Sequence, residues 1–323
     1  MSERLGDRWS RTYALLSALS VSTIFAPYPI DIFERLSREA IDAASNMNDA
    51  YLRNAQQVVG WDDFHRGRIS RAHTAAEELM AMGRRMNDPR STGLGMYLHA
   101  WAALTSDDYL QALNFSETCL GIARAPIDLN SAQTARVAAL VLLRRPEALP
   151  TLQSFIAQCV TNGWNLFLAS ADGMLGIALA INGRIGEGIR QIEQSISRRE
   201  DEGYPAAADW LRMHLCEIYL EIIAGTEKPP ARVVARNALS LVKVIFTAEK
   251  RISSLVEQVR QNPQFDPNGH HIGRCEMILG LLYKAKKKRV LAVQHLTEAK
   301  RITSQFGPTP MLARIDAALA ELA

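Results

Sequence analysis

A two-helix pattern recurs along this chain with a small residue at a nearly constant spacing. The small residues of the successive first helices are Gly60, Ala100, Ala138, Gly176, Cys216 and Gly280. They are separated by 40, 38, 38, 40 and 64 residues. A fixed period of this length is the signature of a repeat protein, because one helical hairpin cannot cover its own apolar face. The chain is therefore predicted to stack its hairpins into one continuous core.

The clearest copy of the pattern lies between Met277 and Arg301, in MILGLLYKAKKKRVLAVQHLTEAKR. Leu279, Gly280 and Tyr283 share one helical face, because spacings of three and four residues bring side chains together. After a lysine-rich turn, a second apolar stripe consists of Ala292, Leu296 and Ala299. This is the pattern of a tetratricopeptide hairpin, in which small residues let the paired helices approach closely.

The expected fold is an all-α, right-handed α-solenoid of tetratricopeptide-like hairpins with a C-terminal capping helix. Its period of 38–40 residues exceeds the usual value of about 34. We predict N-terminal opening helices in residues 1–45 and tetratricopeptide-like repeats in 46–225. Two inserted helices are expected in 226–268, and the last repeat and the capping helix in 269–323. All four segments are expected to form one continuous solenoid.

The four cysteines favour a reducing compartment. They lie far apart among apolar neighbours and form no CxxC pair. A free thiol in such surroundings behaves as a small hydrophobic side chain. The four are Cys119, Cys159, Cys216 and Cys275. We therefore expect unpaired, buried thiols and a cytoplasmic location.

The apolar run from Tyr13 to Pro29 needs to be distinguished from a signal peptide. Acidic Glu3 and Asp7 interrupt the basic residues before it, and no small-x-small cleavage site follows. The run is also too short and too polar to span a bilayer. It is predicted to belong to an opening helical hairpin, and no membrane partner is expected.

Positive charge gathers at the C-terminal end of the chain. Residues 226–323 contain 16 Lys and Arg against 8 Asp and Glu, a net charge of +8, whereas the remainder carries −5. The densest basic run is Lys286, Lys287, Lys288 and Arg289. We favour a solvated turn whose lysines lie at the negative C-terminal end of the preceding helix. The alternative is an anion-binding patch, which Arg274, Lys300 and Arg301 would join.

The sequence contains no catalytic or phosphate-binding motif. The stretch GRIGEGIR is glycine-rich but lacks the Lys-Ser/Thr pair of a phosphate loop. His271 and Cys275 are four residues apart, but a closed zinc site needs four ligands and no second pair supplies them. We interpret His270 and His271 as the start of a helix and Cys275 as a buried thiol. No catalytic residue, metal or cofactor is predicted, and the chain is not expected to be an enzyme.

Four tryptophans lie at or near the first helices of the repeats, where packing between hairpins is their default role. They are Trp61, Trp101, Trp164 and Trp210. Trp210, together with Arg212 and Met213, is instead a candidate for the concave surface, where solenoids bind their partners. Arg274, Met277 and Lys284 of the last repeat are the other candidate partner contacts.

The C-terminal sequence resembles that of a known group of signalling proteins. The stretch GHHIGRCEMILGLLYKAKKKRVLAVQHLTEAKRITSQFGPTPMLARIDAALAEL is similar to the end of large bacterial proteins that join a class III adenylate/guanylate cyclase domain, an ATPase domain and a tetratricopeptide-like region. The resemblance is strongest over 206–322, and FGPTPMLAR is its most specific part. It implies a regulatory region of a cyclic-nucleotide signalling protein, in which Met1 starts a fragment or an orphan relative. No catalytic position of that family has a counterpart here.

The leading functional hypothesis is a non-catalytic solenoid that binds a protein or peptide on its concave face. Under the resemblance, the partners include cyclase or ATPase domains of the same polypeptide. One alternative is a free-standing adaptor or the effector-sensing module of a transcription regulator, although no helix-turn-helix is evident. The other is an anion or nucleic-acid binder acting through the basic C-terminal part. Nucleic acid is not the expected partner, because few aromatic residues are interleaved with the basic ones. The oligomeric state stays open.

Overall fold

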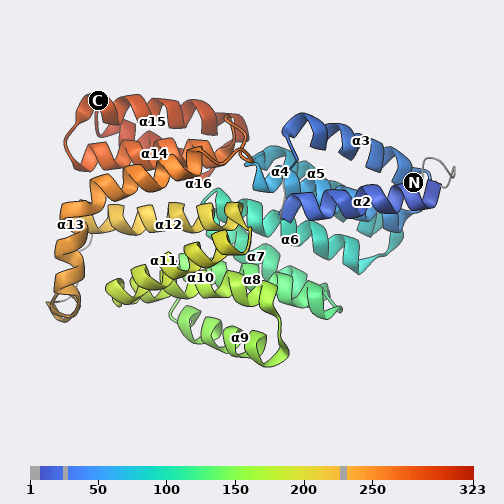
Figure 1. Ribbon diagram of the computed structural model, residues 1–323, viewed down its shortest axis with the longest axis horizontal. Coiled ribbons are helices and arrows are strands. Elements are labelled where there is room, and N and C mark those ends of the chain that lie inside the picture. The colour runs from blue at the N-terminus through green and yellow to red at the C-terminus, as the bar shows by residue number, and fades with distance from the viewer. Residues whose placement is uncertain (1–7, 25–27, 226–230) are drawn as a thin grey trace.

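The computed structural model describes residues 8–24, 28–225 and 231–323, and within these ranges every regular element is a helix (Figure 1). Helices pair along the chain into antiparallel hairpins, each packed on the next. The pairs are α2 (Arg8–Ile24) with α3 (Ile30–Ser45), α4 (Asp49–His65) with α5 (Ile69–Met86), α6 (Pro89–Thr105) with α7 (Tyr109–Ile122), α8 (Pro126–Leu142) with α9 (Ala148–Asn162), α10 (Asn165–Ile181) with α11 (Ile185–Asp201), α12 (Pro205–Ala224) with α13 (Ala231–Arg260), and α14 (His270–Ala285) with α15 (Arg289–Thr303). A short 3-10 turn, η1 (Ser304–Phe306), leads to the terminal helix α16 (Pro310–Ala320). The predicted α-solenoid with a C-terminal capping helix is confirmed.

The repeat positions predicted from the sequence coincide with the observed hairpins. The small residues at 60, 100, 138, 176, 216 and 280 lie on the first helices α4, α6, α8, α10, α12 and α14. Six or seven residues after five of them, the turn into the second helix holds a residue with positive φ. These turn residues are Gly67, Asp107, Arg144, Gly183 and Lys287. The lysine-rich run is thus the turn between α14 and α15, as predicted, with Lys287 in the left-handed conformation at φ 57°.

Small residues bring the two helices of a hairpin into close contact. A Cβ atom added to Gly280 would lie only 2.6 Å from Leu296 Cγ and 3.1 Å from the Leu296 backbone nitrogen. At Gly176 the added atom would lie 2.8 Å from the backbone nitrogen of Ile192. Ala292 is fully buried in the same layer. A larger side chain at these positions would have to push the paired helix away.

Replacing Gly280 with leucine is expected to lower the free energy of unfolding by about 1–3 kcal/mol, because the side chain overpacks the α14–α15 interface. Thermal unfolding followed by circular dichroism measures this loss. The matched control is Gly121→Leu on α7, where no heavy atom lies within 4 Å of the added Cβ. Equal melting temperatures for the two variants would show that Gly280 is not at a close helix contact.

The ends of the chain carry the expected terminal elements. Helices α2 and α3 form the opening hairpin, and α16 begins after Thr309, whose Oγ1 accepts a hydrogen bond of 3.1 Å from the Leu312 backbone nitrogen. Such a cap satisfies one of the free N–H groups at a helix start. None of the described helices has the length and apolarity needed to cross a membrane.

The segment 226–268 differs from the expected pair of inserted helices. It contains one helix of 30 residues, α13, which is the second helix of the hairpin begun by α12. Its sequence has no proline or glycine to end a helix midway, so the two helical patterns join into one. Residues 226–230, which include the Pro-Pro start, lie outside the described residues.

The last repeat returns to contact the early repeats. Arg68 pairs with Asp266 at 2.8 Å, and the backbone nitrogen of His270 donates to the carbonyl of Gly67 at 2.8 Å. One repeat further on, the Met311 nitrogen donates to the Ser106 carbonyl at 3.4 Å. In Figure 1 the orange and red C-terminal helices accordingly lie beside α4. We call these contacts, together with those of Arg274 described below, the closure.

Candidate functional site

The first helices of the repeats line the inside of the solenoid. Successive first helices from α4 to α14 contact one another, and the second helices lie outside them. On this inner surface Trp101 of α6 meets Trp210 of α12, three repeats further along, with ring centroids 6.2 Å apart. A contact between such distant repeats means that the interior is narrow and that these side chains fill it.

Four half-buried aromatic side chains, the inner aromatic group, run across this surface. They are Trp61, Tyr97, Trp101 and Trp210. Ring centroids are 5.0 Å apart for Trp61 and Tyr97, and 6.4 Å apart for Tyr97 and Trp101. Beyond Trp210, the ring of His214 follows at 4.1 Å. Aromatic rings of this kind offer large apolar contact areas at a small cost in conformational entropy.

Charged side chains form a second group, the inner charged cluster, next to the aromatic one. Arg274 donates to the Thr105 carbonyl at 3.0 Å, to Asp107 Oδ1 at 2.8 Å and to both oxygens of Glu217 at 2.9 and 3.0 Å. Arg314 lies 3.2 Å from Glu217 and 3.7 Å from Asp107. His214 lies 3.3 Å from Glu217. The cluster therefore consists of Asp107, His214, Glu217, Arg274 and Arg314.

Opposite charges in the cluster compensate one another. Burial disfavours the ionised form of Glu217, but Arg274, with smaller contributions from His214 and Arg314, outweighs it. The pKa of this carboxyl therefore lies well below its usual value. Arg274 is only 2% exposed, whereas Arg314 is 41% exposed. The buried members hold repeats together, and Arg314 is the member most accessible to a ligand.

The sequence-predicted partner contacts differ in how much of each side chain is exposed. Trp210 belongs to the inner aromatic group, but Met213 and Met277 are 2% and 0% exposed. Met277 lies in an apolar cluster with Leu296, Met311 and Ile315, because α15 and α16 cover its side of α14. As surface contacts these two methionines, and the ion-paired Arg274, are unavailable. Lys284 is on the surface, paired with Glu321 at 2.6 Å.

Four residues of the inner surface were not singled out from the sequence. They are Tyr97, His214, Glu217 and Arg314. Only the i, i+3 spacing of His214 and Glu217 on one helix gave a local signal. Asp107 lies in the turn between α6 and α7, and the contact of that turn with α14 and α16 has no local sequence signal.

The basic run around the lysine-rich turn is partly neutralised. Lys288 pairs with Glu249 of α13, and Arg289 donates to the backbone carbonyl of Ala323 at 2.8 Å. Within the described residues, Lys286 and Lys287 have no carboxylate partner. The run is therefore a solvated turn with two free ammonium groups.

The histidine and cysteine residues near the start of α14 are buried. His270 and His271 open the helix, and Cys275 lies in the core, as the sequence indicated. Burial raises the pKa of the Cys119 and Cys275 thiols to about 12, so neither is a reactive thiolate near neutral pH. All four cysteines are free and buried, which confirms their prediction as small hydrophobic side chains. The described part of the chain holds no group of three or more potential metal ligands.

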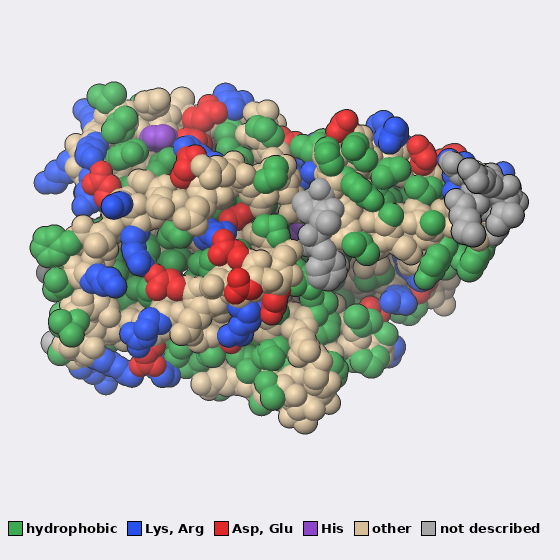
Figure 2. All heavy atoms as spheres, viewed as in Figure 1, with side chains coloured by type: hydrophobic (Ala, Val, Ile, Leu, Met, Phe, Trp, Pro, Cys, Tyr) green, Lys and Arg blue, Asp and Glu red, His purple; other side chains and the backbone are tan. Residues whose placement is uncertain are grey.

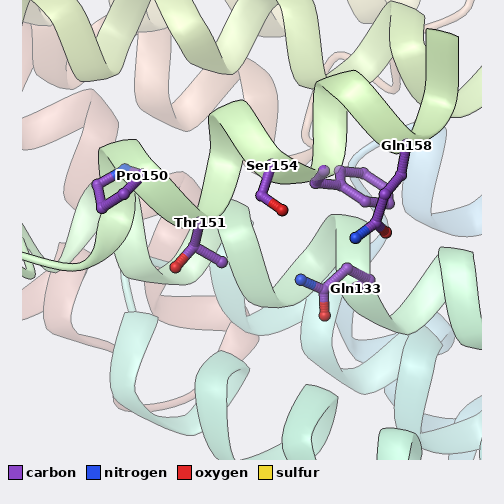
Figure 3. Close-up of a pocket in the computed structure, with 6 residues that line it drawn as sticks. Gln133, Pro150, Thr151, Ser154 and Gln158 are labelled. Carbon is purple, nitrogen blue, oxygen red and sulfur yellow. The ribbon is translucent and has the colours of Figure 1, made fainter. Parts of the chain in front are cut away.

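Two shallow hollows lie elsewhere on the surface. The first, of about 360 Å³, lies between α8 and α9 and is lined by neutral polar groups, among them Gln133, Thr151, Ser154 and Gln158 (Figure 3). The second, of about 290 Å³, lies over α11, α12 and α13. Its arginines, Arg212 and Arg251, already pair with Glu200 and Glu193. The two glutamates of the second hollow are therefore held in ion pairs.

Comparison with known proteins identifies the fold. No protein-family model matches the sequence, and no curated protein matches it either. A solved structure titled Rap protein complexed with competence and sporulation factor is similar over 96% of this chain and 86% of that one, with a TM-score of 0.58 and 12% identity. The apo form of the quorum sensor NprR from B. thuringiensis aligns over 99% of both chains with a TM-score of 0.39 and 12% identity, too weak a match to carry an argument. The similarity to the Rap structure supports a tetratricopeptide-like solenoid fold, and none of the comparisons supports the cyclase–ATPase resemblance.

Proposed function

We propose that this chain is a non-catalytic solenoid whose inner surface binds a peptide or an extended segment of a protein. The observation that carries the proposal is the inner aromatic group, four half-buried side chains contributed by three first helices. Aromatic side chains in such settings supply most of the binding energy at interfaces. A Rap protein with this fold was solved as a complex with competence and sporulation factor, which is consistent with ligand binding by such a solenoid.

The chemistry of the surface suggests what the ligand carries. An apolar or aromatic side chain would stack on Trp101 and Trp210, in place of the ring contact that they make with each other. A carboxylate or backbone carbonyl would interact with Arg314, the exposed arginine of the inner charged cluster. Entry of such a ligand requires the two tryptophans to move apart, so binding would couple to the spacing of α6 and α12.

Two finer functional assignments rest on the sequence alone. A regulatory link to cyclase and ATPase domains is inferred only from the C-terminal resemblance, and the proposed peptide-binding function does not depend on it. The role of a free-standing adaptor or effector sensor is equally compatible with an inner ligand site. Both assignments, a regulatory region and a free-standing sensor, require a site that binds a ligand.

Trp210→Ala is expected to weaken peptide binding by roughly 30-fold or more, the effect of removing an aromatic anchor worth about 2 kcal/mol. Short linear peptides would be selected from a random displayed library on the wild-type protein. Their affinities would then be measured by isothermal titration calorimetry. Trp101→Ala should produce a loss of similar size.

The matched control is Trp164→Ala, which removes a half-buried tryptophan that lies outside the inner aromatic group. Circular dichroism at the titration temperature verifies that each variant is folded. Selected peptides that bind the Trp101 and Trp210 variants as tightly as the wild type would contradict an inner ligand site. A library from which no peptide is enriched would contradict peptide binding itself.

A further inference from the structure

Helix α13 extends beyond the part that the α14–α15 hairpin covers. Near its C-terminal end Arg260 pairs with Glu276 of α14, and in its middle Glu249 pairs with Lys288 of the lysine-rich turn. Since α14 runs antiparallel to α13 and ends at Ala285, the hairpin reaches only as far as Glu249. The first half of α13 turns away from the α14–α15 hairpin and runs down the left side of Figure 1, past the ends of α12 and α11.

The first half of α13, which the α14–α15 hairpin leaves uncovered, carries an apolar stripe. The stripe lies on the same helical face that the hairpin covers in the second half of α13. Ala238, Val242 and Ile245 lie eleven, seven and four residues before Glu249, and these spacings place them on its helical face. Leu239 and Phe246 flank this line and are 90% and 84% exposed. We call the exposed apolar set the ledge; it consists of Val234, Leu239, Val242, Ile245 and Phe246.

The opposite face of this half-helix is fixed to the solenoid. The Asn237 side chain accepts a hydrogen bond of 3.2 Å from the Gly186 nitrogen and donates one of 2.8 Å to the Gly183 carbonyl. Val244 is buried on the same side. The ledge is therefore a preformed surface that is held in place by α11.

Unpaired positive charge surrounds the ledge. Of the described basic residues in 231–323, nine have a carboxylate partner: Arg236, Arg251, Arg260, Arg274, Lys284, Lys288, Lys300, Arg301 and Arg314. Among the described residues, those with neither a carboxylate nor a backbone partner are Arg232, Lys243, Lys250, Lys286 and Lys287. All five lie on α13 or in the lysine-rich turn. Figure 2 shows blue and green side chains side by side along this left edge.

We propose that the ledge is the docking site for an acidic amphipathic helix of a partner protein. A helix is the expected shape, because the α14–α15 hairpin already packs against the same face of α13 further along the chain. From Val234 to Glu249 the surface is about 22 Å long at about 1.5 Å per residue, which accommodates roughly four helical turns. Acidic residues on the partner would pair with the five free basic groups. A second copy of this chain would instead place lysines against lysines.

The experiment uses the full chain and two designed helical peptides of roughly 14 residues, with leucines at i, i+3, i+4 and i+7. One peptide carries glutamates beside the leucines, and the other carries lysines. We expect the acidic peptide to bind at least roughly tenfold more tightly in fluorescence anisotropy. Leu239→Ser/Phe246→Ser and Lys243→Glu/Lys250→Glu should each weaken it by at least roughly tenfold. The matched control, Val160→Ser, alters another exposed apolar residue, 63% exposed on α9, and should leave binding unchanged.

Several outcomes would overturn the proposal. Equal binding of the two peptides, or no binding of either, would exclude an acidic helix. Binding of phosphatidylserine vesicles that Leu239→Ser/Phe246→Ser abolishes, without discrimination between the peptides, would assign the ledge to a membrane surface. A concentration-dependent dimer in analytical ultracentrifugation that is lost in the same variant would assign it to a second copy. Trp210→Ala should leave acidic-peptide binding intact, so this proposal and the inner ligand site fail independently.

Discussion

Replacing Arg274 with alanine is expected to lower the free energy of unfolding by about 3–5 kcal/mol, the range for removal of one partner from a buried ion pair. The guanidinium is 2% exposed and holds Asp107 and Glu217, which are 9% and 13% exposed. Without it, two carboxylates stay in a poorly hydrated site close to each other. The loss of the hydrogen bond to the Thr105 carbonyl adds to the effect. Urea unfolding followed by circular dichroism measures the change.

The control for this prediction is Arg301→Ala. Arg301 also pairs with a carboxylate, Glu298 at 2.7 Å, but the two side chains are 56% and 43% exposed. An exposed pair contributes about 0–1 kcal/mol. If both arginine variants unfold at the same urea concentration, Arg274 does not hold the closure together.

Acidification is expected to weaken the closure through its buried histidines. Burial lowers the pKa of His271 to about 4, with smaller effects of His65 and Arg274, whereas the unperturbed value is 6.5. Above about pH 6.5 His271 is neutral in both the folded and the unfolded state and costs no free energy of unfolding. As the pH falls from there towards 4, the unfolded state binds the proton more tightly, so the free energy of unfolding decreases. By proton linkage, this one group costs about 2 kcal/mol at about pH 5. The pKa of His270 is lowered in the same sense by its burial.

The measurement compares the wild type with His271→Phe, which keeps an aromatic ring next to Phe265, 4.6 Å away in the wild type. The comparison is needed because Asp63 acts in the opposite direction: burial raises its pKa to about 6, so its contribution to stability grows as the pH falls. The difference in unfolding free energy between the two proteins should shift by about 2 kcal/mol in favour of the variant between about pH 7 and pH 5. A difference that is constant with pH would mean that His271 does not titrate in the buried state.

The repeats could be predicted from the sequence because their signals are local. A small residue such as Gly280 must lie where two helices meet, and its recurrence fixes which helix is first in each hairpin. The same reasoning failed for α13, since two apolar patterns without a breaker between them read as two helices or as one. The tryptophans show how far local signals reach. The helix on which Trp210 lies was predictable from the sequence, but the contact of Trp210 with Trp101 was not.

Which side chains meet on the inner surface depends on how far the solenoid winds. No local sequence pattern determines the extent of this winding. Met213 and Met277, both candidate partner contacts, are covered by helices of neighbouring repeats and by α16. Arg274, another candidate contact, is buried in ion pairs. Its carboxylate partners lie 167 and 57 residues away, on elements that only the closure brings together.

The closure also changes how this chain must fold. In an open solenoid each repeat contacts only its neighbours, so stability adds up along one dimension and the ends fray independently. Here Arg66 and Arg68 contact residues 198 positions away, and Arg274 contacts a carbonyl 169 positions away. Such contacts raise the contact order, which slows folding, because the loop must close before the contacts form. They also join the first and last repeats into one cooperative unit, in which the opening of either end releases both.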